Sequence, residues 1–243
     1  MRRLYLLIMG FSFLSSAYAA DELLPAPKQG EWRANVKEEE QTLAAFVATK
    51  PYHATSESIV YVMPVGRFTK EQRRLIGKTA DALAQRLGLT VRIMPDVVLA
   101  KIDESGVRTN PMTGKFQLDA AHVIETFVET QAPSGYASVV AVTAHDIWPG
   151  NATNYVLGLA TPQTRVALVS VARMWEGGVD DVQALERFKK LVAHECLHTF
   201  GLAHETKFRS LMNGYNSISE LDALIDTCAA PSKEKAKVVG ISC

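Results

Sequence analysis

Short apolar runs alternate with long amphipathic stretches over most of this chain, and this alternation limits the fold class. Runs rich in branched apolar residues, typical of buried strands, occur at 59–65, 90–94, 137–144, 154–160 and 165–174. Helices are predicted where apolar residues recur every three or four positions, at 69–89, 118–131 and 182–200. Strands that alternate with helices predict an α/β domain with a mostly parallel sheet.

The N-terminus has the features of a secretory signal peptide. Two arginines precede an apolar run from Leu4 to Leu14, and the small residues Ala17 and Ala19 form a cleavage site. A membrane anchor is the weaker alternative, because the run is about half as long as the ~20 residues needed to span a bilayer. We therefore predict that residues 1–19 are removed on export. The mature protein is expected in the periplasm or outside the cell, with no stable membrane insertion.

The mature chain divides into two predicted segments. Residues 20–56 form a polar N-terminal extension with one short helix near Glu38–Thr49, and residues 57–243 form the folded domain. The extension is long enough to cover a cleft, so a latent protein and an open one both fit the sequence. The formal net charge is zero, which gives no electrostatic basis for binding nucleic acid.

Residues 194–204, HECLHTFGLAH, hold three of the six histidines. His194 and His198 are one helical turn apart, so both imidazoles lie on one face and can bind one zinc ion. Gly201 can adopt a left-handed conformation that ends the helix and brings back His204 as a third ligand. Three neutral nitrogen ligands leave a fourth position open for water, which indicates a catalytic rather than a structural zinc site.

Glu195 follows the first histidine, which places its carboxylate beside the metal but not on it. That is the position of a general base acting on zinc-bound water, and the predicted reaction is hydrolysis of an amide. A lone HExxH also occurs on ordinary helices by accident. From average composition, the full pattern with the glycine and third histidine arises by chance on the order of once in a hundred thousand chains of this size.

HExxHxxGxxH followed by a methionine, here Met212 in SLMNG, resembles the signature of the metzincin metalloproteases. Three stretches before the zinc helix, VAVTAHDIW, NYVLGLA and VALVSVARM, resemble one branch, the archaemetzincins. The resemblance covers about residues 59–228. It implies a metzincin-type catalytic domain with a twisted sheet, an antiparallel edge strand, an active-site helix and a methionine turn.

The resemblance also implies roles for further residues. Met212 would form a hydrophobic floor beneath the metal, with core packing as the alternative. NYVLGLA would be the edge strand to which an extended peptide substrate adds. Tyr215 is a candidate for stabilising the transition state, as tyrosines near the methionine turn do in some metzincins, although its spacing differs from theirs.

Archaemetzincins usually carry a second, structural zinc on four cysteines, and this chain departs from that pattern. Glu205 and Ser210 stand at the first two cysteine positions, and Cys228 begins CAAP instead of a CxxC pair. We therefore expect one catalytic zinc and no second one. A disulfide between Cys228 and Cys243 is a candidate to staple the tail, while Cys196 fits a buried thiol.

Together these features predict an exported, monomeric, zinc-dependent peptidase that acts on a peptide or protein substrate. One alternative is a noncatalytic envelope protein that binds metal and recognises a peptide on the same fold; another is an amidase for a non-peptide substrate. Glu195 favours an enzyme, because a pure binding site gains nothing from an unligated carboxylate beside the water position. Endopeptidase and aminopeptidase action both fit the motif.

Overall fold

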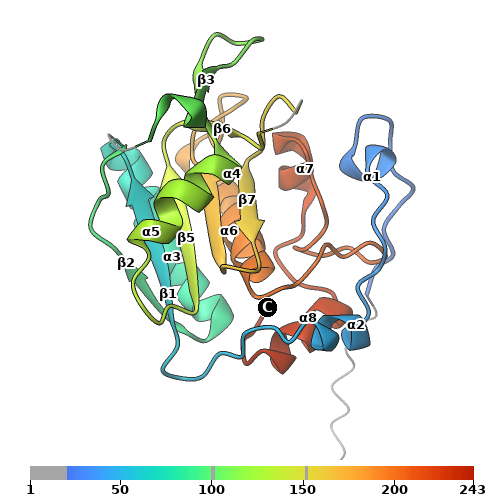
Figure 1. Ribbon diagram of the computed structural model, residues 1–243. Coiled ribbons are helices and arrows are strands. Elements are labelled where there is room, and N and C mark those ends of the chain that lie inside the picture. The colour runs from blue at the N-terminus through green and yellow to red at the C-terminus, as the bar shows by residue number, and fades with distance from the viewer. Residues whose placement is uncertain (1–20, 100–101, 151–152) are drawn as a thin grey trace, which may run out of the picture.

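The computed structural model describes residues 21–99, 102–150 and 153–243 (Figure 1). The predicted signal peptide, residues 1–19, lies outside these ranges. Among the described residues, no helix combines the length and the apolar character that a membrane crossing requires.

Five strands form the central sheet, in the order β2-β1-β5-β8-β7. In that order their bounds are Thr90–Ile93, Ile59–Val65, Ser138–Thr143, Val166–Ser170 and Gly158–Thr161. The strands β2, β1, β5 and β8 are parallel to one another, and β7 at the edge is antiparallel to β8. This confirms the predicted mostly parallel sheet with an antiparallel edge strand.

A second, smaller sheet has the strand order β3-β4-β6. Its strands, preceded by the 3₁₀ turn η2 (Glu104–Gly106), are β3 (Val107–Thr109), β4 (Phe116–Asp119) and β6 (Asp146–Trp148). The β3–β4 pair is antiparallel and the β4–β6 pair is parallel. The apolar patterns of the sequence do not predict this sheet, because strands of three or four residues are too short to show a period.

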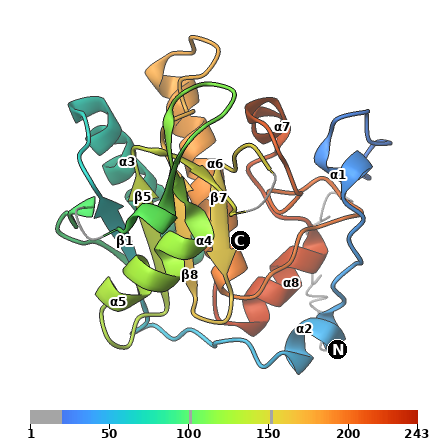
Figure 2. The ribbon, with the colours of Figure 1, turned by 45° about the horizontal axis from the view of Figure 1, so that its top comes forward.

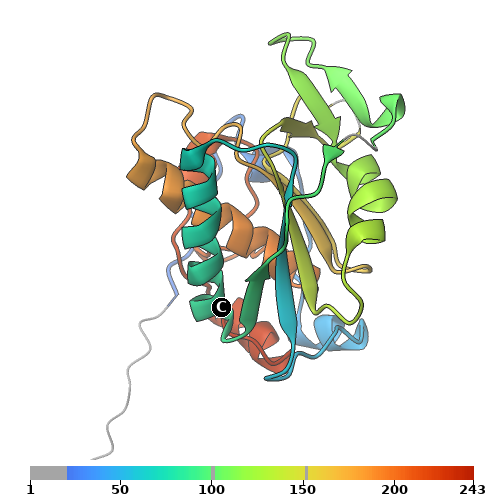
Figure 3. The same ribbon diagram turned by 90° about the vertical axis from the view of Figure 1, so that its left-hand side faces the viewer.

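Helices cover both faces of the central sheet, which makes three layers (Figure 3). On one face lie α3 (Lys70–Leu87) and α6 (Asp181–Thr199), and on the other a consecutive run of α4 (Ala120–Val123), the π-helical turn η3 (Ile124–Val128) and α5 (Glu129–Gln131). A hydrophobic core lies on each side of the sheet. The strands β5 and β8 are buried throughout because they face both cores.

The two long helices begin and end where their caps predict. Thr69 and Gln72 form a capping box at the start of α3, and Gly88 ends the helix with φ 69°. Asp180 caps α6 by accepting hydrogen bonds from two backbone N–H groups. Gly201, with φ 89°, takes the left-handed conformation just after α6. The start of α6 sets the position of His194 along the helix. The turn at Gly201 sets the position of His204, which follows the helix.

The N-terminal extension runs beside the C-terminal part of the chain, as Figures 1 and 2 both show. Its helices α1 (Trp32–Asn35) and α2 (Leu43–Ala48) lie beside α7 (Ile218–Ala223) and α8 (Ala230–Val238), respectively. Backbone hydrogen bonds join the two ends of the chain, for example from Leu24 N to Lys207 O at 2.9 Å and from Ala54 N to Val239 O at 2.8 Å. The predicted bounds of the extension and the domain stay a prediction.

The helix predicted near Glu38–Thr49 is shorter than expected, because residues 38–42 are not helical. The side chains of Glu38 and Gln41 bind to the segment that follows α6 instead, and Thr42 caps the helix that starts at Leu43.

Cys228 and Cys243 form a disulfide with their Cα atoms 5.7 Å apart, 15 residues apart in sequence. This bridge ties the loop before α8 to the C-terminus. Cys196 is a free, buried thiol on α6, and burial raises its pKa to about 12. The thiol is therefore inert at neutral pH.

Candidate metal centre

The three predicted zinc ligands meet at the end of α6. His194 and His198 lie on that helix, and the left-handed Gly201 reverses the chain so that His204 returns to them. One ring nitrogen from each histidine lies within 4.8 Å of the others. The Nε2 atoms of His194 and His198 are 2.9 Å apart. The three histidines of the motif thus form one compact cluster of nitrogen ligands.

Backbone carbonyls hold the first two imidazoles in one orientation. His194 Nδ1 lies 2.8 Å from Leu211 O, and His198 Nδ1 lies 2.6 Å from Leu202 O. A carbonyl only accepts hydrogen bonds, so each Nδ1 carries the proton and donates it. Each Nε2 is therefore unprotonated and available to a metal, the arrangement that hydrogen bonds to ligating histidines usually impose.

The chemistry of this cluster fits a zinc ion. Burial lowers the pKa of His198 to about 3, and burial together with the neighbouring histidines lowers the pKa of His194 well below its usual value. Both imidazoles are thus neutral, which is the form that binds metal. Two unprotonated nitrogens that face each other at 2.9 Å repel unless a cation lies beside them. His194 is 1% exposed, so water does not supply that compensation freely.

His204 differs from the other two ligands because a carboxylate binds its second nitrogen. Its Nδ1 lies 2.8 Å and 3.0 Å from the two carboxylate oxygens of Glu38, a residue of the N-terminal extension. The indole N–H of Trp32 donates to the same carboxylate at 3.1 Å. Burial disfavours the charged carboxylate, but the hydrogen bonds from His204 and Trp32 outweigh it and lower the pKa of Glu38. The sequence motif gave no signal for these two residues.

Glu195 lines the same cavity as the three histidines. Glu195 is 5% exposed, and the hydroxyl of Tyr215 donates to its Oε1 at 3.1 Å. Burial raises the pKa of Glu195 to about 8, although the Tyr215 hydrogen bond lowers it in part. Burial and the carboxylate raise the pKa of Tyr215 well above its usual value. The ring centroids of Tyr215 and His194 are 4.9 Å apart, so the tyrosine lies beside a predicted metal ligand.

Gly158 at the start of β7 makes room for Glu195. A Cβ atom added at Gly158 would lie 2.5 Å from Glu195 Cγ and 2.6 Å from its Oε1, far inside van der Waals contact. The edge strand and the active-site helix therefore touch at this point. The sequence placed Gly158 in a strand but gave no sign of this role.

Met212 lies in a tight turn after the third histidine and is fully buried in the core. Asn213 stabilises the turn by accepting from Ser210 N and by donating to two backbone carbonyls. The carbonyl of Leu211, directly before Met212, is the acceptor for His194. The turn thus helps to orient a ligand, while a floor beneath the metal stays a prediction.

The positions that carry cysteines in archaemetzincins with a second zinc make backbone contacts here. The carboxylate of Glu205 accepts hydrogen bonds from Lys207 N and Phe208 N, at 2.9 Å and 3.2 Å. The hydroxyl of Ser210 accepts from Met212 N and from Ala229 N. Both groups thus hold the loop through hydrogen bonds, and the absence of a second zinc stays a prediction.

A cleft of about 270 Å³ opens over the three histidines. Its walls come from β7 and the residues before it on one side, and from Trp32, Tyr215 and Asn216 on the other. Apolar residues, including Tyr155, Leu159 and Pro162, line much of it. The shape and the reactive groups make this cleft the candidate active site.

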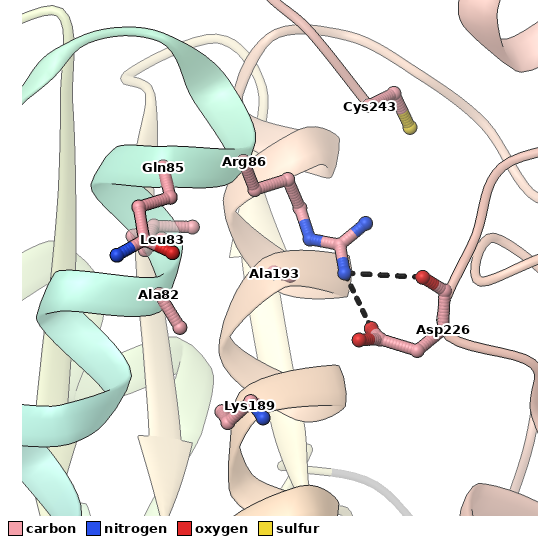
Figure 4. A pocket seen from close by; sticks show the side chains of 8 residues that line it. All are labelled: Ala82, Leu83, Gln85, Arg86, Lys189, Ala193, Asp226 and Cys243. Atoms are coloured by element: carbon pink, nitrogen blue, oxygen red, sulfur yellow. Dashed lines mark hydrogen bonds and ion pairs between the residues drawn. The ribbon is translucent and has the colours of Figure 1, made fainter.

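A second hollow of about 420 Å³ lies between α3, α6 and the C-terminal loop (Figure 4). An ion pair crosses it, in which the Arg86 guanidinium donates to the Asp226 carboxylate at 2.5 Å and to its backbone carbonyl at 3.2 Å. None of the predicted metal ligands nor Glu195 lines this hollow. It is larger than the cleft but carries no catalytic arrangement.

The fold is similar to crystal structures of archaemetzincins. The structure from Methanopyrus kandleri aligns with a TM-score of 0.60 and 24% identity over 75% of this chain and 95% of that one. The structure from Archaeoglobus fulgidus, complexed with malonate, aligns with a TM-score of 0.58 and 22% identity over 73% and 99%. These likenesses support the fold.

The sequence is similar to curated archaemetzincins. The protein from Halobacterium salinarum is 30% identical over 170 residues, which covers 67% of this chain and 90% of that protein. The protein from Thermococcus kodakarensis is 24% identical over 168 residues, 68% of this chain and 87% of the relative. The longer archaemetzincin-2 of Mus musculus is 23% identical, and the match spans 65% of its length. No family model matches the chain.

Proposed function

Because the chain belongs to the archaemetzincin family of zinc metallopeptidases, we propose that it is an exported zinc-dependent peptidase in which Glu195 is the general base. The family relationship supports the zinc cofactor, the peptidase activity and a peptide or protein substrate. Export and the role of Glu195 as the general base go beyond what the family relationship supports, and each rests on separate observations.

His194, His198 and His204 would hold the zinc ion, since their three ring nitrogens converge. When bound, zinc supplies Lewis-acid polarisation of the scissile carbonyl and acidifies water at the open position of the site. The protein's own contribution is to keep the imidazoles neutral and aimed. The carbonyls of Leu211 and Leu202 do this for the two helical ligands.

The placement of Glu195 carries the proposed mechanism. Its carboxylate lies at the cleft beside the three histidines, held between the Tyr215 hydroxyl and the Gly158 backbone. From there it can accept a proton from the attacking water and pass it to the leaving amine. A cation in the adjacent site favours the charged form of the carboxylate, which burial disfavours.

The substrate backbone would bind along β7. This strand is at the edge of the central sheet and also lines the cleft. An extended peptide can add to such an edge through backbone hydrogen bonds, with side chains in the pockets on either side. Because Tyr155, Leu159 and Pro162 line the cleft, we expect apolar side chains next to the cleaved bond.

Export is supported by two features. One is the N-terminal pattern of positive charge, apolar run and small cleavage residues. The other is the pairing of Cys228 with Cys243, because disulfides persist mainly outside the cytoplasm. The check is cell fractionation followed by N-terminal sequencing. A mature protein that begins at Ala20 in the exported fraction is the expected result, and an uncleaved cytoplasmic protein would contradict export.

The activity test compares the zinc-loaded mature protein with Glu195→Ala and Tyr215→Phe at equal measured zinc content. The substrate is a diverse library of quenched peptides. Loss of a general base lowers the rate by about 10²–10⁴-fold, so cleavage should largely disappear in Glu195→Ala. Tyr215→Phe should lower kcat by roughly 10-fold or more with little change in KM, if the hydroxyl positions Glu195 or stabilises the transition state.

A noncatalytic peptide-binding protein is the second candidate, and the same test separates it. Equal zinc content in parent and variant, with no cleavage by either, would favour binding over catalysis. Cleavage that survives unchanged in Glu195→Ala would refute the general-base role while leaving the peptidase in place.

A further inference from the structure

The N-terminal extension reaches the metal centre through the carboxylate of Glu38. Both oxygens of this carboxylate lie within hydrogen-bond distance of His204 Nδ1, at 2.8 Å and 3.0 Å. The side chain of Glu38 is 30% exposed and that of His204 is 19% exposed, so water competes only in part. The contact joins residues 166 positions apart in the chain.

Trp32 holds this carboxylate in place. Its indole N–H donates to Glu38 at 3.1 Å, and its ring lies edge-on to the His204 ring with centroids 5.6 Å apart. The indole packs directly on Gly214, where an added Cβ atom would lie 2.2 Å from the indole nitrogen. The backbone N–H of Trp32 also donates to Glu220 at 2.8 Å. The Glu38 carboxylate is thus held by the Trp32 indole as well as by the His204 imidazole.

Gln41 binds the turn that carries the third ligand. Its side-chain amide donates to Gly201 O at 3.0 Å, and its carbonyl accepts from Ala203 N at 3.0 Å. These two backbone groups lie between His198 and His204 in the chain. One short segment of the extension therefore holds both the backbone before His204 and the ring of His204.

We infer that Glu38 is a positioning residue of the zinc site, and that residues 32–41 complete the metal centre and are not a removable cover over it. The inference rests on the proposed function, because it assigns a role at the same zinc site. The sequence left open whether the extension makes the protein latent, and the contacts favour a segment that belongs to the site over a latent cover.

The physical role follows from the geometry. The carboxylate fixes the proton of His204 on Nδ1, so Nε2 is free to face the other ligands. It also brings one negative charge next to the three imidazoles, which raises the affinity for a divalent cation. The two helical ligands donate to backbone carbonyls, which are uncharged. Glu38 is thus the charged hydrogen-bond partner within this set of three ligands.

The test measures zinc affinity on the full mature chain by competition with a chromophoric zinc chelator. Parent, Glu38→Gln and Glu38→Ala are compared with Glu39→Gln and Glu39→Ala, which change the exposed neighbouring residue on the same segment. Substitution of hydrogen-bond partners of metal ligands typically weakens affinity 10–100-fold, so Glu38→Ala should fall in about this range. Glu38→Gln keeps an acceptor but loses the charge, and should fall between parent and alanine.

Two further readouts separate positioning from folding. The absorption spectrum of the cobalt-loaded protein should change in both Glu38 variants, because the geometry of His204 changes. The melting temperature of the metal-free protein should stay close to that of the parent in Glu38→Gln. The Glu39 variants should match the parent in affinity and spectrum.

The outcomes distinguish the inference from its premise. Zinc binding within about twofold of the parent in both Glu38 variants, with an unchanged cobalt spectrum, would overturn the inference alone. A parent that holds no zinc, or whose zinc does not depend on His204, would overturn the proposed function and this inference with it. Graded weakening from glutamate to glutamine to alanine, absent at Glu39, would support the inference.

Discussion

The contact between Gly158 and Glu195 allows a sharp test of the site. In Gly158→Ala the new methyl group would lie 2.5–2.7 Å from three atoms of the Glu195 side chain, about 1 Å inside ordinary contact. The backbone of Gly158 does not have the positive φ that disfavours alanine, so the expected effect comes from the side-chain clash. Glu195 is buried on a packed helix, so its carboxylate must rotate away from the position that receives the proton.

The expected magnitude follows from the loss of a positioned base. A general base contributes about 10²–10⁴ in rate, which corresponds to about 3–5 kcal/mol in the barrier. Overpacking against the buried Glu195 side chain costs a further ~1–3 kcal/mol in the free energy of unfolding. We therefore expect kcat of Gly158→Ala to fall at least about 100-fold, while zinc content stays at the parent level because the three histidines keep their places.

The assay is peptide hydrolysis at matched zinc content, with Gly77→Ala as the control. Gly77 lies on α3 with nothing within 4 Å of an added Cβ atom, so its substitution should leave activity unchanged. In the Glu195→Ala background, Gly158→Ala should cost no further activity, because the group it displaces is gone. Hydrolysis by Gly158→Ala within about threefold of the parent would refute the close contact or the role of Glu195.

Two further predictions concern stability. Replacing both Cys228 and Cys243 with alanine should lower the free energy of unfolding by about 3 kcal/mol, the value for a 15-residue loop, and lower Tm by roughly 6–12 °C. A reductant should shift the Tm of the parent but not of the variant, and a variant that melts within about 2 °C of the oxidised parent would contradict this. The hydrogen bond from Arg187 lowers the pKa of Asp222, so the pair stabilises the fold above the unfolded pKa of about 3.9 and loses this contribution as pH falls through the folded pKa. Asp222→Asn should cost roughly 1–3 kcal/mol in urea unfolding at about pH 7 and progressively less as the pH falls below about 3.9, and a cost independent of pH would exclude this origin.

Local patterns predicted the parts of the fold whose signals lie within one element. Gly88 ends α3 as the pattern indicates. The apolar residues that indicate the buried face of this helix are all buried, namely Leu75, Ile76, Ala80, Leu83 and Leu87. The stretch NYVLGLA gave a strand, but β7 begins only at Gly158, because Val156 pairs with Ile147 of the smaller sheet in an isolated bridge. That pairing depends on tertiary contacts, which no local period records.

In the metal centre, too, the residues with a local sequence signal were predicted and those placed by tertiary contacts were not. The motif indicated His194, His198 and His204 through their spacing on and after one helix, and the structure brings them together. Glu38 lies in a segment for which the sequence predicts a helix, because the residues of this segment have high helix propensity. The hydrogen bond to a histidine 166 residues away competes with that local preference, and such a contact has no signature in a single sequence.

The hydrogen bond between Glu38 and His204 has a consequence for the time at which the site forms. During synthesis the carboxylate leaves the ribosome long before the histidine does, and the ligand set is complete only when the chain has been made past His204. If the chain crosses a membrane unfolded, it cannot carry its zinc with it. The metal would then be drawn from the compartment in which the protein folds, and the zinc supply there would decide how much of the protein is active.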